Sequence, residues 1–188
     1  LASASNYWSL SGWQHDLHWG FEVQLPKQHF DYALADGSLK KTISQWQALG
    51  IKPRHTVNMR LLGQQQATLF LPSGHQGPAY LLLNNFRSIL KYNNSSSYAL
   101  AIGLLSNALQ GDYNPPASWP KHERMLSRTE RIELQALLNQ LGFDSGHPDG
   151  IIGINSRQAV RSFQQAQGLP ADGYPNDALL DHVRKAAR

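Results

Sequence analysis

The hydrophobic residues recur with two different periods along the chain, and these periods predict its strands and helices. Residues 21–25 (FEVQL) alternate between apolar and polar positions before Pro26, as a short half-buried strand does. Residues 67–71 and 78–83 are rich in leucine and aromatic side chains, and they flank a turn-like PSGHQG segment. We therefore expect these two runs to pair as antiparallel strands.

Apolar residues spaced three and four positions apart predict the helices. In residues 38–49 the apolar side chains follow these steps, and Gly50 comes directly after them. Ser127 precedes another such pattern with Glu130 three residues on, which is the spacing of a capping box. The polar residues 93–97 supply N-cap candidates for a helix over 97–109. The predicted helices are 5–12, 38–49, 86–92, 97–109, 127–141, 156–167 and 178–183.

A proline-rich stretch divides the chain into two regions. Residues 111–120 contain three prolines and a glycine, a composition that cannot propagate a helix and is typical of a domain linker. We place a first domain at 1–112, a linker at 113–124 and a second domain at 125–188. The first domain is predicted to be α+β, with helices and a small antiparallel sheet, and the second to be a three-helix domain.

Composition narrows the function classes. The 188 residues include no cysteine, which excludes disulfide scaffolds, thiol nucleophiles and thiolate metal sites. No apolar run approaches the roughly 18 residues that a membrane span needs. The formal net charge of +4 suits an anionic polymer, either cell wall or nucleic acid. The sequence contains no nucleic-acid-binding motif and no arginine cluster, so no nucleic-acid partner is expected.

The second domain carries a specific motif. Residues 149–173 read DGIIGINSRQAVRSFQQAQGLPADG, and this run resembles the peptidoglycan-binding domain family, three-helix modules that are fused to many wall-degrading enzymes. Ser156 stands where the family has threonine, and either hydroxyl can cap a helix. Asp149 and Asp172 precede glycines, which favours Asx turns over a metal or acid-catalyst role. Phe163 is predicted to lie in the core, and Gln164 either contacts a ligand or faces solvent.

The first domain carries a second motif. Residues 85–102 read NFRSILKYNNSSSYALAI, and they follow Asn6-Tyr7, Gly12-Trp13, FDYALA at 30–35 and WQALG at 46–50. In this order the five blocks resemble the lytic murein transglycosylase B family over about residues 1–110. The resemblance implies part of a lysozyme-like enzyme that cleaves the MurNAc–GlcNAc bond without water and leaves 1,6-anhydroMurNAc ends.

The family's catalytic acid has no counterpart in this sequence. The family uses a glutamate in a Glu-Thr segment upstream of the Ala-Asn-Tyr helix, so the resemblance places the acid upstream of Leu1 and no catalytic residue within the chain. Glu22 is the only glutamate before residue 123, and strand alternation gives it no claim to a buried position. The chain begins at Leu1 without a methionine or signal peptide, and we expect a processed product or a fragment.

The same resemblance implies the partners and the candidate site. Peptidoglycan glycan strands, muropeptides and the upstream part of the same protein are the expected partners, in the periplasm, either free or associated with the outer membrane. No cofactor is implied, and His147 and His182 are too isolated for a metal site. The alternative is a non-catalytic peptidoglycan-binding protein, which the missing glutamate supports.

Four residues match the family's glycan cleft, namely Asn85, Phe86, Tyr92 and Asn93. An amide can bond hydroxyl or N-acetyl groups, and an aromatic ring can stack on a pyranose face. The alternatives are that Asn85 caps a helix and that Phe86 lies in the core. For Tyr92 and Asn93, sugar binding and a structural role are likewise both open. Further candidate sugar platforms are Trp8, Trp13 and Trp19, whereas Trp46 fits the apolar stripe of its helix.

Overall fold

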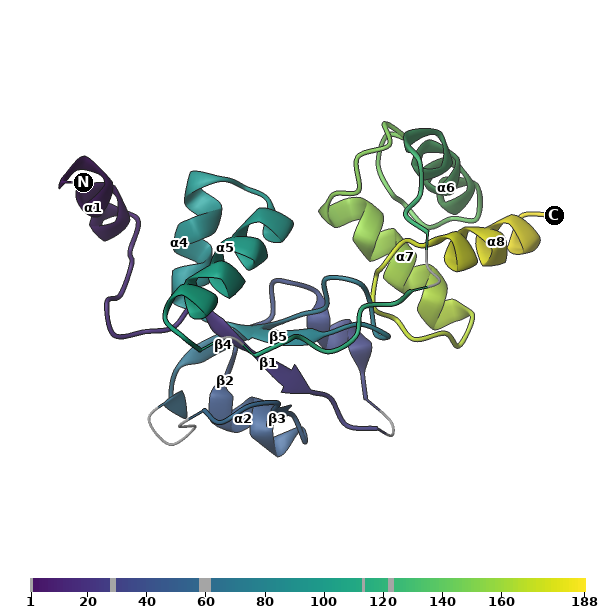
Figure 1. The fold of residues 1–188 in the computed structure, drawn as a ribbon. Helices are drawn as coiled ribbons and strands as arrows, with labels where there is room; N and C mark the ends of the chain where they lie inside the picture. Colours follow the sequence, from purple (N-terminus) through teal and green to yellow (C-terminus); the bar gives the residue numbers. More distant parts are fainter. Residues whose placement is uncertain (1, 28–29, 58–61, 113, 122–123) are drawn as a thin grey trace. The chain divides into compact units, whose positions relative to one another are not determined.

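The computed structural model describes residues 2–27, 30–57, 62–112, 114–121 and 124–188 (Figure 1). The chain forms two compact units. Unit 1 comprises Leu1–Phe30, Gly37–Pro72 and Gly77–Ser118, and unit 2 comprises Asp31–Asp36, Ser73–Gln76 and Trp119–Arg188. Two short stretches from the first predicted domain therefore belong to unit 2. In the described residues no helix has the length and apolar character of a membrane span.

A five-stranded antiparallel sheet forms the centre of unit 1, in the order β2-β4-β5-β1-β3. The three predicted strands are confirmed to within one residue at each end. Glu22 lies opposite Tyr80, and Leu69 lies opposite Leu81. The strands are β1 (Gly20–Gln24), β2 (Lys41–Thr42), β3 (Lys52–Pro53), β4 (Gln66–Phe70) and β5 (Ala79–Leu82).

The helix predicted over 38–49 begins later than the hydrophobic pattern indicates. Helix α2 spans Ile43–Ala48, because Thr42 caps it and Lys41–Thr42 pair with β4 as a strand. The Thr42 hydroxyl accepts from Gln45 N (3.2 Å), and Gln45 Oε1 accepts from Thr42 N (2.9 Å). Trp46 is confirmed as core, since it is fully buried and its Nε1 donates to the Ala67 carbonyl.

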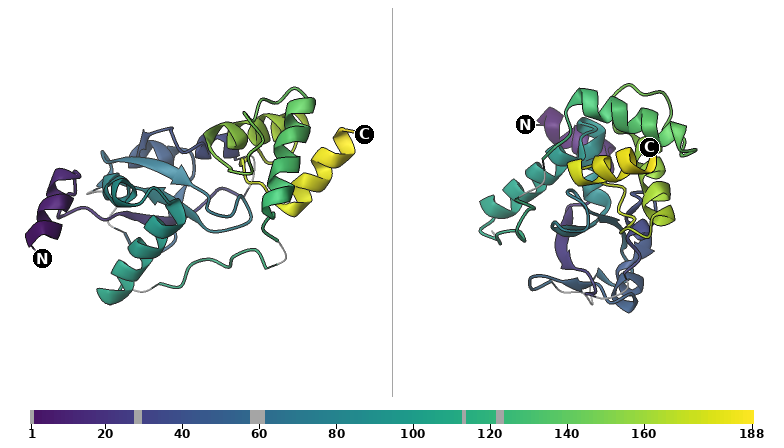
Figure 2. Two further views of the ribbon diagram at one scale, coloured as in Figure 1. Left: turned by 90° about the horizontal axis from the view of Figure 1, so that it is seen from above. Right: turned by 90° about the vertical axis from the view of Figure 1, so that its right-hand side faces the viewer.

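Helices α4 (Asn84–Tyr92) and α5 (Ser96–Leu109) lie against one face of the sheet, and α1 (Ala2–Leu10) lies beyond them (Figures 1 and 2). Ser95 caps α5 by accepting from Tyr98 N, as the polar run predicted. Six residues from the sheet, the two helices and the loop before β1 form the shared core: Trp19, Tyr80, Phe86, Ile89, Ala99 and Leu100.

Gly103 allows α5 to approach the Trp19 ring closely. A Cβ at Gly103 would lie 2.5 Å from two indole carbons, and that indole also donates to Asn107 Oδ1. We expect Gly103→Ala to lower the free energy of unfolding by about 1–3 kcal/mol, because a rigid buried ring cannot yield. Thermal unfolding measures this. Ala101→Gly on the exposed face of α5 is the control, with a loss near 1 kcal/mol from helix propensity alone. A gain in stability for Gly103→Ala would contradict the close packing.

Three helices form most of unit 2: α6 (Arg128–Gln140), α7 (Ile154–Ala166) and α8 (Asp177–Ala186). The predicted capping box of Ser127 and Glu130 is confirmed, and so is Phe163 as a core residue. The predicted capping role of Ser156 is wrong, because α7 begins two residues earlier, after Gly153. The Ser156 hydroxyl instead accepts from Gln135 Nε2 at 2.9 Å.

Both Asp-Gly pairs of the motif form the expected Asx turns. Asp149 Oδ1 accepts from Ile151 N (2.7 Å), and Asp172 Oδ1 accepts from Tyr174 N (2.9 Å). Gln164 behaves differently from both predictions for it. It is buried, its Nε2 donates to Asp172 Oδ1, and its Oε1 accepts from Gly173 N. Gln164 therefore fixes the second turn.

The short segments of unit 2 are bound to the helical part by polar contacts. Asp172 Oδ2 accepts from His75 N (2.9 Å) and lies 2.7 Å from His75 Nδ1. Arg161 donates to the carbonyl of Ala35, which ends the 3-10 helix Tyr32–Ala35. Burial alone would raise the pKa of Asp172, but hydrogen bonds from His75, Tyr174 and Gln164 outweigh it and hold this pKa below its ordinary value.

Candidate functional site

An aromatic surface in unit 1 brings together side chains from three helices. We define it as Tyr7 and Trp8 on α1, Tyr92 on α4 and Tyr98 on α5. The Tyr92 ring lies 6.0 Å from Tyr7, 6.2 Å from Trp8 and 6.4 Å from Tyr98, the last in a stacked arrangement. Tyr92 is 64% exposed, so a flat ligand can reach its ring. Amphipathic rings grouped in this way suit the apolar faces and hydroxyl edges of sugars.

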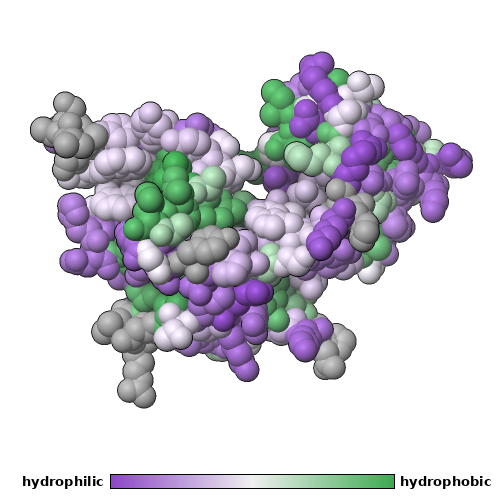
Figure 3. Space-filling view, in the orientation of Figure 1, coloured by the Kyte–Doolittle hydropathy of each residue, from purple (hydrophilic) through white to green (hydrophobic). Residues whose placement is uncertain are grey.

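Tyr92 and Asn93 are exposed because α4 ends between them. Tyr92 is the last helical residue, and Asn93 takes an extended conformation that turns the chain towards Ser95. Tyr92, which is part of the aromatic surface, and the neighbouring Asn93 both expose their side chains to solvent. Figure 3 shows a hydrophobic area over α5, and two exposed leucines, Leu105 and Leu109, belong to this helix.

Asn85 and Phe86 are buried, so neither lies where a glycan could touch it. Asn85 Oδ1 accepts from Gln14 N (2.8 Å), and its Nδ2 donates to the carbonyls of Gln14 and Leu17. Phe86 packs at 6.1 Å from the Trp19 ring. The capping-and-core alternative therefore describes these two residues better, although Asn85 fixes a loop rather than a helix end. Trp19 is also buried and is no sugar platform.

Glu22 is buried, although strand alternation gave no reason to expect a buried position for it. Its side chain is only 6% exposed, and its Oε1 accepts from Ala117 N (2.8 Å), in the segment between the two units' helices. Arg54 Nε lies 3.6 Å from Oε1, and His55 Nε2 lies 3.7 Å from Oε2. The negative charge of the buried Glu22 carboxylate is thus partly compensated. Glu22 lies in a different part of unit 1 from the aromatic surface.

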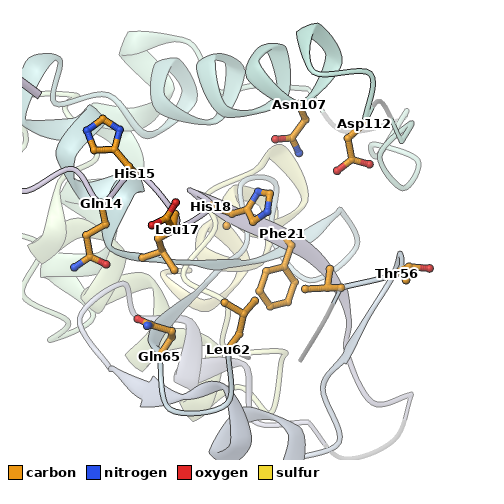
Figure 4. A pocket seen from close by; sticks show the side chains of 13 residues that line it. Gln14, His15, Leu17, His18, Phe21, Thr56, Leu62, Gln65, Asn107 and Asp112 are labelled. Atoms are coloured by element: carbon orange, nitrogen blue, oxygen red, sulfur yellow. The ribbon is translucent and has the colours of Figure 1, made fainter. Parts of the chain in front are cut away.

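The loop held by Asn85 lines a pocket of about 580 Å³. In Figure 4, Gln14, His15 and His18 come from this loop, whereas Asn107 and Asp112 come from the end of α5 and the residues after it. Phe21 of β1 and the residues at 56–57, 62 and 65 complete the lining. Within the described part of the chain, no three His, Asp or Glu side chains are grouped so that they could hold a metal ion.

Comparison with known proteins identifies both parts of the chain. The model of the transglycosylase SLT domain matches residues 1–107, more than half of the sequence. The chain belongs to the transglycosylase SLT domain family. The peptidoglycan binding domain model matches residues 127–183, which includes all three helices of unit 2 up to Val183. Both family resemblances drawn from the sequence motifs are confirmed.

The present chain is similar over 97% of its length to SltB3 from Pseudomonas aeruginosa, with 49% sequence identity and a TM-score of 0.90. That protein has been solved in complex with NAG-anhNAM-pentapeptide and with NAG-NAM-pentapeptide. The SLT chain spans about half of the SltB3 chain, 49% of its length. The predicted α+β class, with a helical second domain, is confirmed.

Shorter matches concern curated enzymes. The SLT chain is 36% identical over 66 residues to the spore cortex-lytic enzyme of Bacillus cereus, which is 35% of this chain and 26% of that enzyme. The corresponding enzyme of Oceanobacillus iheyensis is 39% identical over 56 residues, 30% of this chain and 20% of that enzyme. These matches leave most of both enzymes uncovered.

Neither the burial of Glu22 nor the polar pocket follows from the local sequence pattern. Four consecutive residues of β1, Gly20–Val23, are buried, so the strand is covered on both faces. His15, Asp16 and His18 stand in a short polar stretch of the sequence, and only their arrangement around one cavity distinguishes them.

Proposed function

We propose that this chain is part of a peptidoglycan lytic transglycosylase that cleaves the MurNAc–GlcNAc bond without water and leaves 1,6-anhydroMurNAc ends. The observation that carries this proposal is the 49% identity to SltB3 over 97% of the chain, together with the two muropeptides named in the SltB3 complexes. Peptidoglycan glycan strands and muropeptides are then the partners, and the periplasm, free or at the outer membrane, is the location.

In this proposal the chain supplies binding surfaces rather than the acid. The aromatic surface, with Tyr92 and Asn93, contacts the glycan, and the helices of unit 2 bind the wall. Asn85 acts as a positioning residue, because its three hydrogen bonds fix the loop at 14–17. The glutamate that protonates the glycosidic oxygen and then assists the muramyl 6-hydroxyl comes from the upstream part of the protein. An internal hydroxyl thereby replaces the water of ordinary glycoside hydrolysis.

Tyr92→Ala tests the contact between the aromatic surface and sugar. We expect affinity for a soluble NAG-NAM tetrasaccharide to fall about 5–30-fold, the loss of 1–2 kcal/mol that one stacking face provides. Calorimetric titration of the 188-residue chain measures the affinity. The thermal midpoint should stay within a few degrees, since Tyr92 is exposed.

Leu105→Ala is the matched control for this variant. Leu105 is also an exposed hydrophobic residue, 54% accessible, and it lies on α5 outside the aromatic surface. Its affinity should equal that of the unmodified chain. If Tyr92→Ala also binds the tetrasaccharide normally, the sugar does not contact the aromatic surface and the assignment of this site fails.

A further inference from the structure

A small cavity beside the sheet of unit 1 contains polar atoms without hydrogen-bond partners. Its volume is about 70 Å³, and Glu22, His55 and Tyr80 lie in its lining. The Tyr80 hydroxyl and His55 Nε2 are buried atoms, and within the described part of the chain neither has a hydrogen-bond partner. The Tyr80 residue is only 1% exposed, and burial, reinforced by the Glu22 carboxylate, raises the pKa of its hydroxyl. Unpaired buried polar atoms are costly and rare, so a group that supplies their hydrogen bonds is indicated.

Glu22 brings a negative charge to this cavity. Oε1 accepts from Ala117 N and faces Arg54. Oε2 has His55 Nε2 at 3.7 Å, which is beyond hydrogen-bond distance. A carboxylate this well buried attracts a cation far more strongly than an exposed one does, and it repels anions.

The cavity adjoins the pocket of about 580 Å³ described above. Both are lined by Phe21, Thr56, Val57, Asn107 and Asp112. Asp16 and Asp112 add two carboxylates to the lining of the larger pocket, and among the described residues Arg54 is the guanidinium that lies next to Glu22. A ligand can therefore place a bulky part in the larger pocket and extend a narrow arm to Glu22.

We propose that the cavity binds a primary ammonium group at the end of a flexible aliphatic arm. An ammonium has three N–H donors, and the cavity places the unpaired Tyr80 oxygen next to the Glu22 carboxylate, whose oxygens can accept them. A carboxylate or phosphate would meet the repulsion of Glu22. On the function proposed above, the arm is the side chain of the diamino acid in a peptidoglycan stem peptide.

A pair of ligands that differ only at the amine tests this site. One is a NAG-NAM-tripeptide ending in lysine, and the other is the same compound acetylated at Nε. We expect acetylation to weaken binding to the 188-residue chain about 10–100-fold, because a hydrogen bond from an ammonium to a buried carboxylate is lost. Calorimetric titration measures both affinities.

Two variants separate binding from folding. Tyr80→Phe removes a hydroxyl that has no partner, so the thermal midpoint should not fall, whereas the preference for the free amine should drop severalfold. Glu22→Gln removes the charge and should abolish most of the preference. Tyr32→Phe in unit 2, outside both the cavity and the aromatic surface, is the matched control and should retain the preference.

The outcomes distinguish this inference from the proposed function. Equal binding of both ligands overturns the ammonium site and leaves glycan binding intact. Binding of neither ligand contradicts the proposed function, and 1-aminopentane compared with 1-pentanol then tests the cavity by itself. If the chain binds the amine no better than the alcohol, or if Tyr80→Phe keeps the full preference, the ammonium site is wrong.

Discussion

The 188-residue chain alone is expected to release no 1,6-anhydromuropeptides from peptidoglycan, whereas the same chain joined to its upstream portion releases them. Acid–base assistance by one positioned side chain is typically worth about 10²–10⁴-fold. The carboxylates of unit 1 that line pockets are Asp16, Glu22 and Asp112, and none of them lies in a segment that matches the family's Glu-Thr motif. Chromatography of wall digests measures the products.

Two variants control this comparison. In the joined protein, glutamine in place of the Glu-Thr glutamate should abolish product release at unchanged wall binding. In the chain alone, Glu22→Gln tests whether the buried Glu22 carboxylate acts as the catalytic acid. Anhydro products from the chain alone that vanish in Glu22→Gln would contradict the proposal and assign the acid role to Glu22. A chain that binds the wall but never gains activity when joined would instead favour a non-catalytic binding protein.

Asp172→Ala is expected to lower the free energy of unfolding of unit 2 by about 3–4 kcal/mol. The Asp172 side chain is 4% exposed and accepts hydrogen bonds from Tyr174 N, Gln164 Nε2 and His75 N. Its removal leaves the buried Gln164 Nε2 and the two part-buried backbone donors without their acceptor, and it also removes the 2.7 Å contact with His75 Nδ1. Thermal and denaturant unfolding of the chain measure the loss.

The matched control is Asp181→Ala on α8. The Asp181 side chain is 64% exposed and pairs with Arg184 on the surface, a contact worth less than about 1 kcal/mol. If both variants lose equal stability, the buried hydrogen bonds of Asp172 contribute nothing beyond a surface pair, which contradicts the prediction.

The contribution of Asp172 should also depend on pH in one direction. Its pKa is lower in the folded state than the ordinary value, so folding favours the ionised carboxylate. The stabilisation is complete above the unfolded pKa of about 4 and is lost as pH falls through the folded value. The difference in stability between the unmodified chain and Asp172→Asn should therefore shrink below about pH 4. A constant difference down to pH 2 would contradict this.

Local signals in the sequence predicted most of the elements. The strands of β4 and β5, the capping box at Ser127 and the Asx turn at Asp149 depend on residues a few positions apart, so a short window contains their causes. The helix at 38–49 shows the limit of this reasoning. Its first residues follow a helical period, yet Lys41 and Thr42 gain more from pairing with β4.

The candidate site depended on contacts between distant segments, and here the predictions were weaker. Asn85 is buried because its amide meets the loop at 14–17, some 70 residues earlier. Glu22 is buried because Ala117 passes over it, and no property of β1 alone indicates this. The exposure of Tyr92 has a local cause, because Tyr92 ends its helix directly before a polar run.

The discontinuous make-up of unit 2 has a consequence for how such a domain is inherited. A gene segment that begins at the linker would encode α6, α7 and α8, but it would leave behind Asp31–Asp36 and Ser73–Gln76. The recipient protein would have to supply new neighbours for Asp172 and Arg161, or lose those charges. In this chain the helical module and the sequence before it are therefore expected to evolve together, with substitutions at His75 and Asp172 accepted in pairs.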